Sequence, residues 1–234
     1  MKTNRGVFHR IQKLLFCVRH FLEFIPIMQI FKDLGHMNSM KTRQSIDADG
    51  KPIPWYTYPI IEFLSQFDFS KKNVFEYGSG NSTLWWAKRA SSVTFAEHNP
   101  DWYARTISSY PENVFPSLNE NPQLYADSID GNYDIIIIDG CWRDLCAKKA
   151  LEHVKDDGII IIDDAQRVQS IEEYKIAMKL LQSDPRFIQI DFKGFTPIAG
   201  FTKVTSMFLS RKIDLCRNSE YIPTYGEGNL RNEY

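Results

Sequence analysis

Acidic residues stand at the ends of several short apolar segments of this chain. Glu76 and Glu97 close two of the segments, Asp139 follows a third, and Asp163 with Asp164 follows a fourth. Carboxylates in such positions can accept hydrogen bonds, hold a cation or take up a proton. Ligands of open parallel sheets bind outside the carboxyl ends of the strands, so these acids are the first candidates for a site if the segments are strands of one sheet.

A glycine-rich turn, Gly78-Ser79-Gly80, follows the first of these acids. The two glycines permit positive φ and let a ligand approach the backbone closely. A dinucleotide-binding fingerprint would place glycine or alanine three residues later, where this chain has Thr83. Glu76 would also repel a pyrophosphate and attract a cation. S-adenosylmethionine carries an ammonium and a sulfonium and no phosphate, so the segment favours it over NAD.

Two further positions suit a nucleoside. Glu97 lies 19 residues beyond Gly78 and can accept hydrogen bonds from both hydroxyls of a ribose. That role is common to sites for NAD and for adenosylmethionine and does not separate them. Asp127, followed by Ser128, can accept a bond from an adenine amino group at the end of a third strand or in the loop after it.

The elements that would position these residues alternate along the chain. Helical spacing and short apolar runs follow one another from Trp55 onward, and two alternating segments near the C-terminus predict a β-hairpin. We expect helices over Tyr58–Phe67, Ser82–Ala90, Asp101–Ser109, Cys146–Val154 and Gln166–Leu181, and strands over Asn73–Tyr77, Ser92–Glu97, Tyr133–Asp139, Gly158–Asp163, Phe187–Phe192 and Lys203–Ser210. Residues 110–130 give no clear pattern.

Two isoleucine runs, Ile135–Ile138 and Ile159–Ile162, show no alternation with polar residues. Strands of that kind are buried on both faces, in the centre of a parallel sheet that is covered by helices. We therefore expect an α/β fold whose sheet occupies residues 55–212. A helical extension over 1–40 and a linker over 41–54 would precede it, and a polar, loosely attached tail over 213–234 would follow it.

The N-terminal segment is amphipathic and basic. Apolar residues recur at helical spacing from Phe8 to Ile25, and Pro26 is expected to bend or end that helix. Residues 1–32 carry six basic residues and one acidic residue, whereas the whole chain has a net charge of -1. Two interpretations stay open: a helix packed on the body of the protein, and peripheral contact of residues 1–34 with an anionic membrane.

Composition excludes several other classes. A net charge of -1 gives no general attraction to nucleic acid. The four cysteines form no C-x-x-C pair, so neither a zinc knuckle nor a disulfide framework is expected. Charged residues interrupt each apolar run of the N-terminal segment, which argues against a membrane-spanning helix and a signal peptide. We expect a cytoplasmic location, with or without membrane association.

The combination of these motifs resembles the class I S-adenosylmethionine-dependent methyltransferases. The resemblance covers residues 55–210 and rests on Glu76-x-Gly78-x-Gly80, Glu97, the two isoleucine strands and the closing hairpin. It implies a Rossmann-like, seven-stranded, mostly parallel sheet whose last strand is antiparallel. It also implies cofactor contacts by Glu76, Gly78, Ser79, Gly80, Asn81, Ser82, Glu97, His98, Asp127, Ser128 and Asp139. The aromatic residues Trp55, Tyr56 and Tyr58 would either close over the methionine end or fill the core.

The acids that follow the later strands resemble those of metal-assisted O-methyltransferases of the catechol type. That resemblance implies a magnesium ion held by Asp139, Asp163 and Asp164, with Asp139 and Asp163 in the reaction. The catechol enzymes carry a lysine a few residues after the first acid, where this chain has Arg143. Arginine is a poor base, so Arg143 is expected to orient a charged acceptor.

The leading hypothesis is therefore a methyltransferase that modifies an oxygen of a small molecule or glycan. Two alternatives remain: an NAD-dependent oxidoreductase, and a membrane-associated binding protein with a vestigial nucleotide pocket. The acceptor and the oligomeric state have no signature in the sequence.

Overall fold

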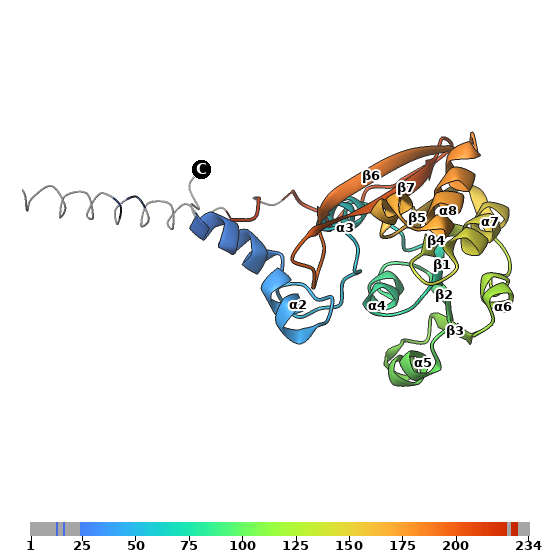
Figure 1. The fold of residues 1–234 in the computed structure, drawn as a ribbon, viewed down its shortest axis with the longest axis horizontal. Helices are drawn as coiled ribbons and strands as arrows, with labels where there is room; N and C mark the ends of the chain where they lie inside the picture. The colour runs from blue at the N-terminus through green and yellow to red at the C-terminus, as the bar shows by residue number, and fades with distance from the viewer. Residues whose placement is uncertain (1–12, 14–15, 17–23, 224–225, 229–234) are drawn as a thin grey trace, which may run out of the picture.

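The computed structural model of the chain describes residues 13, 16, 24–223 and 226–228. Its centre is a seven-stranded sheet with the order β3-β2-β1-β4-β5-β7-β6 (Figure 1). The strands β1 to β5 are parallel neighbours, and β7 is antiparallel to both β5 and β6. The strands are β1 (Asn73–Tyr77), β2 (Ser92–Glu97), β3 (Val114–Leu118), β4 (Tyr133–Ile138), β5 (Val154–Ile162), β6 (Phe187–Phe195) and β7 (Thr202–Ser210). This is the α/β fold class that the sequence predicts.

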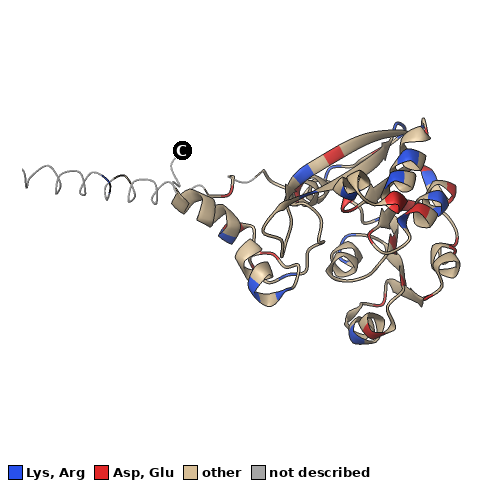
Figure 2. Ribbon diagram, viewed as in Figure 1, with Lys and Arg blue, Asp and Glu red and all other residues tan. Residues whose placement is uncertain are grey.

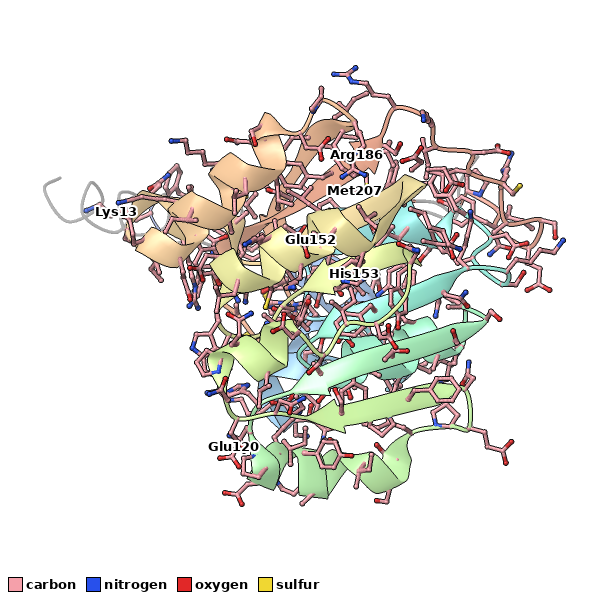
Figure 3. All side chains as sticks on the ribbon, turned by 90° about the vertical axis from the view of Figure 1, so that its right-hand side faces the viewer. Lys13, Glu120, Glu152, His153, Arg186 and Met207 are labelled. Atoms are coloured by element: carbon pink, nitrogen blue, oxygen red, sulfur yellow. The ribbon has the colours of Figure 1, made fainter. Side chains whose placement is uncertain are left out.

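Helices cover both faces of the sheet. They are α2 (His36–Thr42), α3 (Tyr58–Ser65), α4 (Asn81–Ala87), α5 (Pro100–Thr106), α6 (Pro122–Ala126), α7 (Arg143–His153) and α8 (Glu172–Ser183), with short 3-10 turns η1 (Ile107–Ser109) and η2 (Ala165–Gln169). Figure 3, seen from the right of Figure 1, has Met207 of β7 among the upper strands and Glu120, just after β3, at the opposite edge of the sheet.

The isoleucine strands divide the core into two halves. Ile135 and Ile137 belong to a cluster shared with α3 and α4, whereas Ile136 and Ile138 belong to a cluster shared with α7 and α8. All four side chains are almost completely buried. Strand β4 is apolar on both faces, so it packs against a helical layer on each side of the sheet. The absence of polar–apolar alternation in its sequence predicts this double burial.

The sequence pattern misses elements in residues 110–130. The structure has β3 and α6 there. Strand β3 lies at the edge of the sheet, contains Pro116, and leaves Phe115 and Leu118 exposed. An edge strand does not need the continuous apolar run of a central strand, and it tolerates a proline. Likewise, the helix expected from Gln166 is interrupted, since η2 precedes an α8 that begins at Glu172.

The N-terminal segment differs from expectation in two ways. Residues 24–33 are helical on both sides of Pro26, so proline does not end this helix. Most of the amphipathic stretch from Phe8 to Ile25 lies outside the described residues. The linker expected over 41–54 is a folded turn instead, in which Ile46 bridges Pro52 and the Asn81 side chain donates a 2.7 Å hydrogen bond to the Ser45 carbonyl.

Parts of the C-terminal tail that the structure describes contact the body. Phe67 forms a bridge with Arg217, and the Asn218 amide donates to the Gln66 carbonyl at 2.8 Å. The Gly228 amide donates to an oxygen of Asp33 at 3.0 Å. Residues 217–218 therefore lie at the end of α3, and residue 228 lies beside the helix of residues 24–33 (Figure 1). Within the described residues, no helix combines the length and apolarity that crossing a bilayer requires.

A core substitution tests the central position of β4. Ile137→Ala should lower the free energy of unfolding by about 2–5 kcal/mol, because a buried isoleucine loses its transfer free energy and leaves a cavity. Ile188→Ala on β6, where 43% of the residue is exposed, is the matched control and should cost less than about 1 kcal/mol. Urea unfolding measures both. Equal losses would contradict the burial assigned to β4.

Candidate functional site

The carboxyl ends of four strands meet at one edge of the sheet. Tyr77 of β1 is paired with Ala96 of β2 and with Ile138 of β4, and Ile138 is paired with Ile162 of β5. The acidic residues at or after these positions are therefore neighbours at one edge of the sheet, although Glu76 and Asp164 are 88 positions apart in the chain. This edge is the candidate site.

The glycine turn after β1 is shaped by two close approaches. Gly78 has φ 101°, and a Cβ at this position would lie 3.2 Å from the backbone of Asp139. Its amide donates to the Ala96 carbonyl at 2.8 Å. Gly80 has φ 158°, and the nearest atom to a Cβ there would be on Trp102, at 3.7 Å. The turn thus packs tightly against β4 at Gly78 and is open at Gly80, where a ligand would approach the backbone.

Glu76 is buried beneath this turn, with only 1% of the residue exposed. The Thr83 hydroxyl donates to its Oε2 at 2.5 Å and accepts from the Gly80 amide at 3.0 Å. Its Oε1 is buried and makes no hydrogen bond of normal geometry in the described structure. A buried acceptor without a partner is costly, so this oxygen marks a place where a donor or a cation would be favourable.

Burial also changes the acid–base properties of this carboxyl. Desolvation raises the pKa of Glu76 to about 8, against the opposing effect of the Ser82 and Thr83 hydroxyls. The nearby carboxylates of Asp139 and Glu97 raise it further. Near neutral pH the carboxyl therefore holds its proton until a cation arrives.

Glu97 at the end of β2 is held by hydrogen bonds on both oxygens. Its Oε1 accepts from the amides of His98 and Asn99, each at 2.9 Å, and its Oε2 accepts from the Ser79 hydroxyl at 2.7 Å. Only 4% of the residue is exposed. These bonds fix the carboxylate next to the glycine turn. If the Ser79 hydroxyl turned to another acceptor, Oε2 of Glu97 could accept a hydrogen bond from a ligand instead.

An aromatic cluster beyond Glu97 was not identified from the sequence. The rings of His98, Tyr125 and Trp142 contact one another edge-on, with centroid distances of 5.3–6.1 Å. The Cys141 sulfur lies 3.4 Å from Nε2 of His98. Trp142 has a left-handed backbone, with φ 50°. Nothing in the local pattern marks Trp142 and Tyr125 as partners of His98, because only the parallel order of β2, β1 and β4 brings them together.

The two residues expected at the adenine end lie in the connection that follows β3, directly after α6. Asp127 is the C-terminal cap of α6 and pairs with Lys149 of α7 at 2.9 Å. The Ser128 hydroxyl donates to the Leu124 carbonyl and accepts from the Asn119 side chain at 2.6 Å. The Asp127 carboxylate is therefore ion-paired with a lysine of α7, whereas the Ser128 hydroxyl contacts the loop that follows β3.

Arg143 differs most from expectation. Its guanidinium is buried, donates to the carbonyls of Ile138 at 2.6 Å and Asp163 at 2.9 Å, and lies 4.8 Å from the ring centroid of Tyr174. It also contacts Asp139 at 3.3 Å. These groups use donors of Arg143 inside the protein, where its guanidinium joins the ends of β4 and β5.

The three carboxylates expected to bind magnesium do not form a metal site. Asp163 accepts a 2.6 Å bond from Thr205, and Asp164 is paired with Lys203 at 2.9 Å and Arg167 at 3.0 Å. Among the residues that the structure describes, no group of three or more histidine, cysteine or acidic side chains is arranged to hold a metal ion. The structure therefore gives no support to magnesium at these acids: Asp139 and Asp164 are paired with cationic side chains of the protein, and Asp163 accepts from a threonine hydroxyl.

The environments of these acids differ. Burial, with the charges of Asp139 and Asp164, raises the pKa of Asp163 to about 8. For Asp164 the effect of burial is outweighed by Lys203, Gln166 and Arg167, which together lower the pKa. Burial raises the pKa of Asp139 against the opposing charge of Arg143. Asp139 is the more accessible of the pair with raised pKa, since 25% of its side chain is exposed.

The three aromatic residues before α3 have different surroundings. Tyr56 is completely buried, and its hydroxyl, which has no hydrogen bond of normal geometry, is close enough to Glu76, Asp139 and Asp163 for their charges to raise its pKa. Trp55 is 44% exposed, with the Lys203 ammonium 4.8 Å from its ring centroid. The Tyr58 hydroxyl lies 3.4 Å from Nδ1 of His36. Of the three, Tyr56 adjoins the acidic strand ends.

Comparison with known proteins identifies the fold through solved structures, whereas the comparisons by sequence give no match. No protein-family model matches the sequence, and no curated protein matches it either. An O-methyltransferase from Bacillus cereus in complex with S-adenosylhomocysteine superposes with a TM-score of 0.51 at 15% identity, over 65% of this chain and 78% of that chain. A Klebsiella pneumoniae protein assigned as an O-methyltransferase gives 0.51 at 16% identity, over 64% and 76%.

A spermidine synthase from Thermotoga maritima gives a TM-score of 0.48 at 17% identity, over 62% of this chain and 54% of that chain. This chain therefore spans about half the length of that protein. The first two superpositions, with the strand order, establish that the chain has the Rossmann-like fold of class I S-adenosylmethionine-dependent methyltransferases.

The raised pKa of Glu76 predicts a pH-dependent stability. Between its ordinary pKa of 4.5 and about 8, the folded state binds a proton that the unfolded state has lost, so stability falls as pH rises through this window. This one group contributes a slope of up to about 1.4 kcal/mol per pH unit. Glu76→Gln should therefore unfold at higher urea than the parent at pH 8.5 and lose part of the slope. Glu172→Gln, on an exposed side chain, should leave the slope unchanged, and an equal change in both variants would contradict the prediction.

Proposed function

We propose that the protein binds S-adenosylmethionine at the carboxyl edge of its sheet and transfers the methyl group to an oxygen of a small molecule or glycan. The observation that carries the proposal is the buried Glu76 carboxyl beside a glycine turn, whose Oε1 makes no hydrogen bond of normal geometry with the described residues. An acid in this place has a charge suited to an ammonium or sulfonium group. The methyltransferase fold supports the same assignment.

Each part of such a cofactor is assigned here to residues at this edge. Glu76 and the turn Gly78-Ser79-Gly80, with Asn81 and Ser82 at the start of α4, would hold the methionine part. Glu97 would take the ribose hydroxyls on the oxygen that now accepts from Ser79. His98 and Trp142 would flank the adenine, because they are the aromatic residues next to Glu97 and the end of β4. Ser128 would lie at its polar edge.

Asp139 is the proposed acid–base residue. When bound, S-adenosylmethionine supplies an electrophilic methyl group, and the protein has to orient an acceptor hydroxyl and remove its proton. Asp139 has a raised pKa and a partly exposed side chain at the end of β4. Asp163 is nearly inaccessible and is fixed by Thr205, so it would act through Asp139 as a positioning residue. Arg143 would position both strand ends.

The alternative of an NAD-dependent oxidoreductase meets an obstacle at Thr83. The Thr83 side chain is buried and ties the Gly80 amide to Glu76. A bound pyrophosphate would need the Gly80 amide as a donor, but Thr83 already accepts from that amide. The pyrophosphate would also lie close to the Glu76 carboxyl, and Thr83 occupies the position of the third glycine of a dinucleotide-binding turn. NAD would need a free Gly80 amide and no nearby negative charge, whereas the ammonium or sulfonium of S-adenosylmethionine is favoured by the Glu76 carboxylate.

Calorimetric titration distinguishes these cofactors. Adenosylhomocysteine, which keeps the ammonium, should bind, and NADH should not. Glu76→Gln should weaken binding of adenosylhomocysteine at least tenfold, corresponding to about 1.4 kcal/mol, because the amide cannot offer a negative charge. Glu172→Gln is the control for a lost surface charge. Binding of NADH alone, or unchanged affinity in Glu76→Gln, would contradict the proposal.

A second variant tests the acid–base role. Asp139→Asn should reduce methyl transfer to a responsive acceptor pool by about 10²–10⁴-fold, and adenosylhomocysteine affinity should stay within a few-fold of the parent. Labelled adenosylmethionine with fractionated small-molecule and glycan extracts supplies the assay. Asp130→Asn, on an exposed loop, should be fully active. Full activity of Asp139→Asn would assign the proton transfer to another group.

A further inference from the structure

A glutamate, a histidine and a cysteine form a chain of contacts at the ends of β2 and β4. The Cys141 sulfur lies 3.4 Å from Nε2 of His98, and Nδ1 of His98 lies 3.2 Å from Oε1 of Glu97. Glu97 ends β2, whereas Cys141 is the third residue after β4 and lies 43 positions from His98 in the chain. A thiol, an imidazole and a carboxylate in this order are the parts of an activated nucleophile.

The proton of neutral His98 is favoured on the side of Glu97. Nδ1 is buried and makes no hydrogen bond of normal geometry in the described structure, but the ionised carboxylate beside it can only accept. That carboxylate is fixed by the backbone amides of His98 and Asn99. A proton on Nδ1 leaves the lone pair on Nε2, which faces the thiol. His98 is therefore placed to receive a proton from Cys141.

The thiol needs a base of this kind in order to react. Burial raises the pKa of Cys141, and nearby glutamates raise it further against the charge of Arg143. The reactive form of a cysteine is the thiolate, so the proton has to leave as the sulfur attacks. Cys141 is only half-buried, and 36% of the His98 side chain is exposed. A small molecule can therefore reach the pair.

A buried donor without a partner points into the same place. Tyr125 of α6 is completely buried, and its hydroxyl makes no hydrogen bond of normal geometry in the described structure. A Cβ on Gly140, the residue before Cys141, would lie 1.9 Å from that hydroxyl. The Tyr125 ring lies 5.3 Å from that of Trp142, the residue after Cys141. An unpaired buried hydroxyl is costly, so a polar group bound beside Cys141 would be favourable.

The charges that act on the thiol are mainly negative. Helices α7 and α8 pack against each other and carry residues of both signs, as Figure 2 shows. At Cys141 the glutamates are Glu97 and Glu173. The cation that opposes them, Arg143, is paired with Asp139 at 3.3 Å. A negatively charged reagent would therefore be repelled, whereas a neutral or cationic one would not.

We propose that Cys141 is a modification site that takes a small neutral or cationic disulfide, with His98 as the base. As the Cys141 sulfur attacks one sulfur of the disulfide, its proton passes to Nε2 of His98. A bond forms between these two sulfurs, the S–S bond of the reagent breaks, and the leaving thiolate takes the proton from His98. One disulfide is consumed and one is formed, so no further oxidant is required. An excess of thiol reverses the reaction.

Mass spectrometry on the full chain tests the proposal, with cystamine as the probe. Cys17→Ser and Cys216→Ser are introduced first, because Cys17 lies outside the described residues and Cys216 is exposed. This reference protein should gain one adduct, on Cys141 and not on the buried Cys146, and dithiothreitol should remove it. Glutathione disulfide, which is anionic, should react about tenfold more slowly. An adduct that forms only after unfolding in urea, or equal rates with both disulfides, would overturn the proposal.

Histidine variants of the reference protein test the base. His98→Gln should slow the adduct by about tenfold or more, because glutamine cannot take up the proton. His153→Gln is the matched control, since it removes a histidine at the opposite end of α7, and it should react like the reference protein. In urea, where the contacts are lost, all three proteins should react alike. A folded His98→Gln protein that reacts at the reference rate would refute the role of His98.

A consequence for the cofactor rests on the function proposed above. His98 and Trp142 are the residues assigned to the adenine, so an adduct on Cys141 would occupy that place. Saturating adenosylhomocysteine should therefore prevent the adduct, and the modified protein should lose calorimetric binding of adenosylhomocysteine until dithiothreitol is added. Unchanged binding by the modified protein would contradict this blockade. If the unmodified protein does not bind adenosylhomocysteine, the proposed cofactor is wrong, and the first two experiments alone decide the reactivity of Cys141.

Discussion

The desolvated carboxyl of Glu76 is the constraint on which the rest of the site depends. It lies in a central strand, where no water reaches it, and Thr83 ties it to the amide of Gly80. The same short chain of bonds therefore sets the shape of the glycine turn and the charge preference of the space above it. A carboxyl that is protonated in the absence of a cation and ionised beside one would discriminate between ligands by charge.

The neighbouring acids are tolerated because the protein supplies its own counter-charges. Arg143 joins the ends of β4 and β5 through their carbonyls, and Lys203 with Arg167 neutralises Asp164. Asp139 and Asp163, like Glu76, have a raised pKa, whereas the pKa of Asp164 is lowered. Acids of the same type at one sheet edge therefore differ in their acid–base properties, because their burial and their side-chain partners differ.

Much of the architecture was determined by the sequence alone. The two isoleucine runs required a sheet buried on both faces, the strands β1 and β2 were predicted to the residue, and Glu76, Gly78, Gly80 and Glu97 were identified because strand ends converge in a parallel sheet. Only the tertiary structure decided what each side chain contacts. In the folded protein the Arg143 guanidinium is bonded to buried carbonyls, Asp164 is ion-paired with Lys203, and the rings of His98 and Trp142 are in edge-on contact. These contacts link residues far apart in the chain, and one sequence carries the local periodicity of its elements but not the register that brings their ends together.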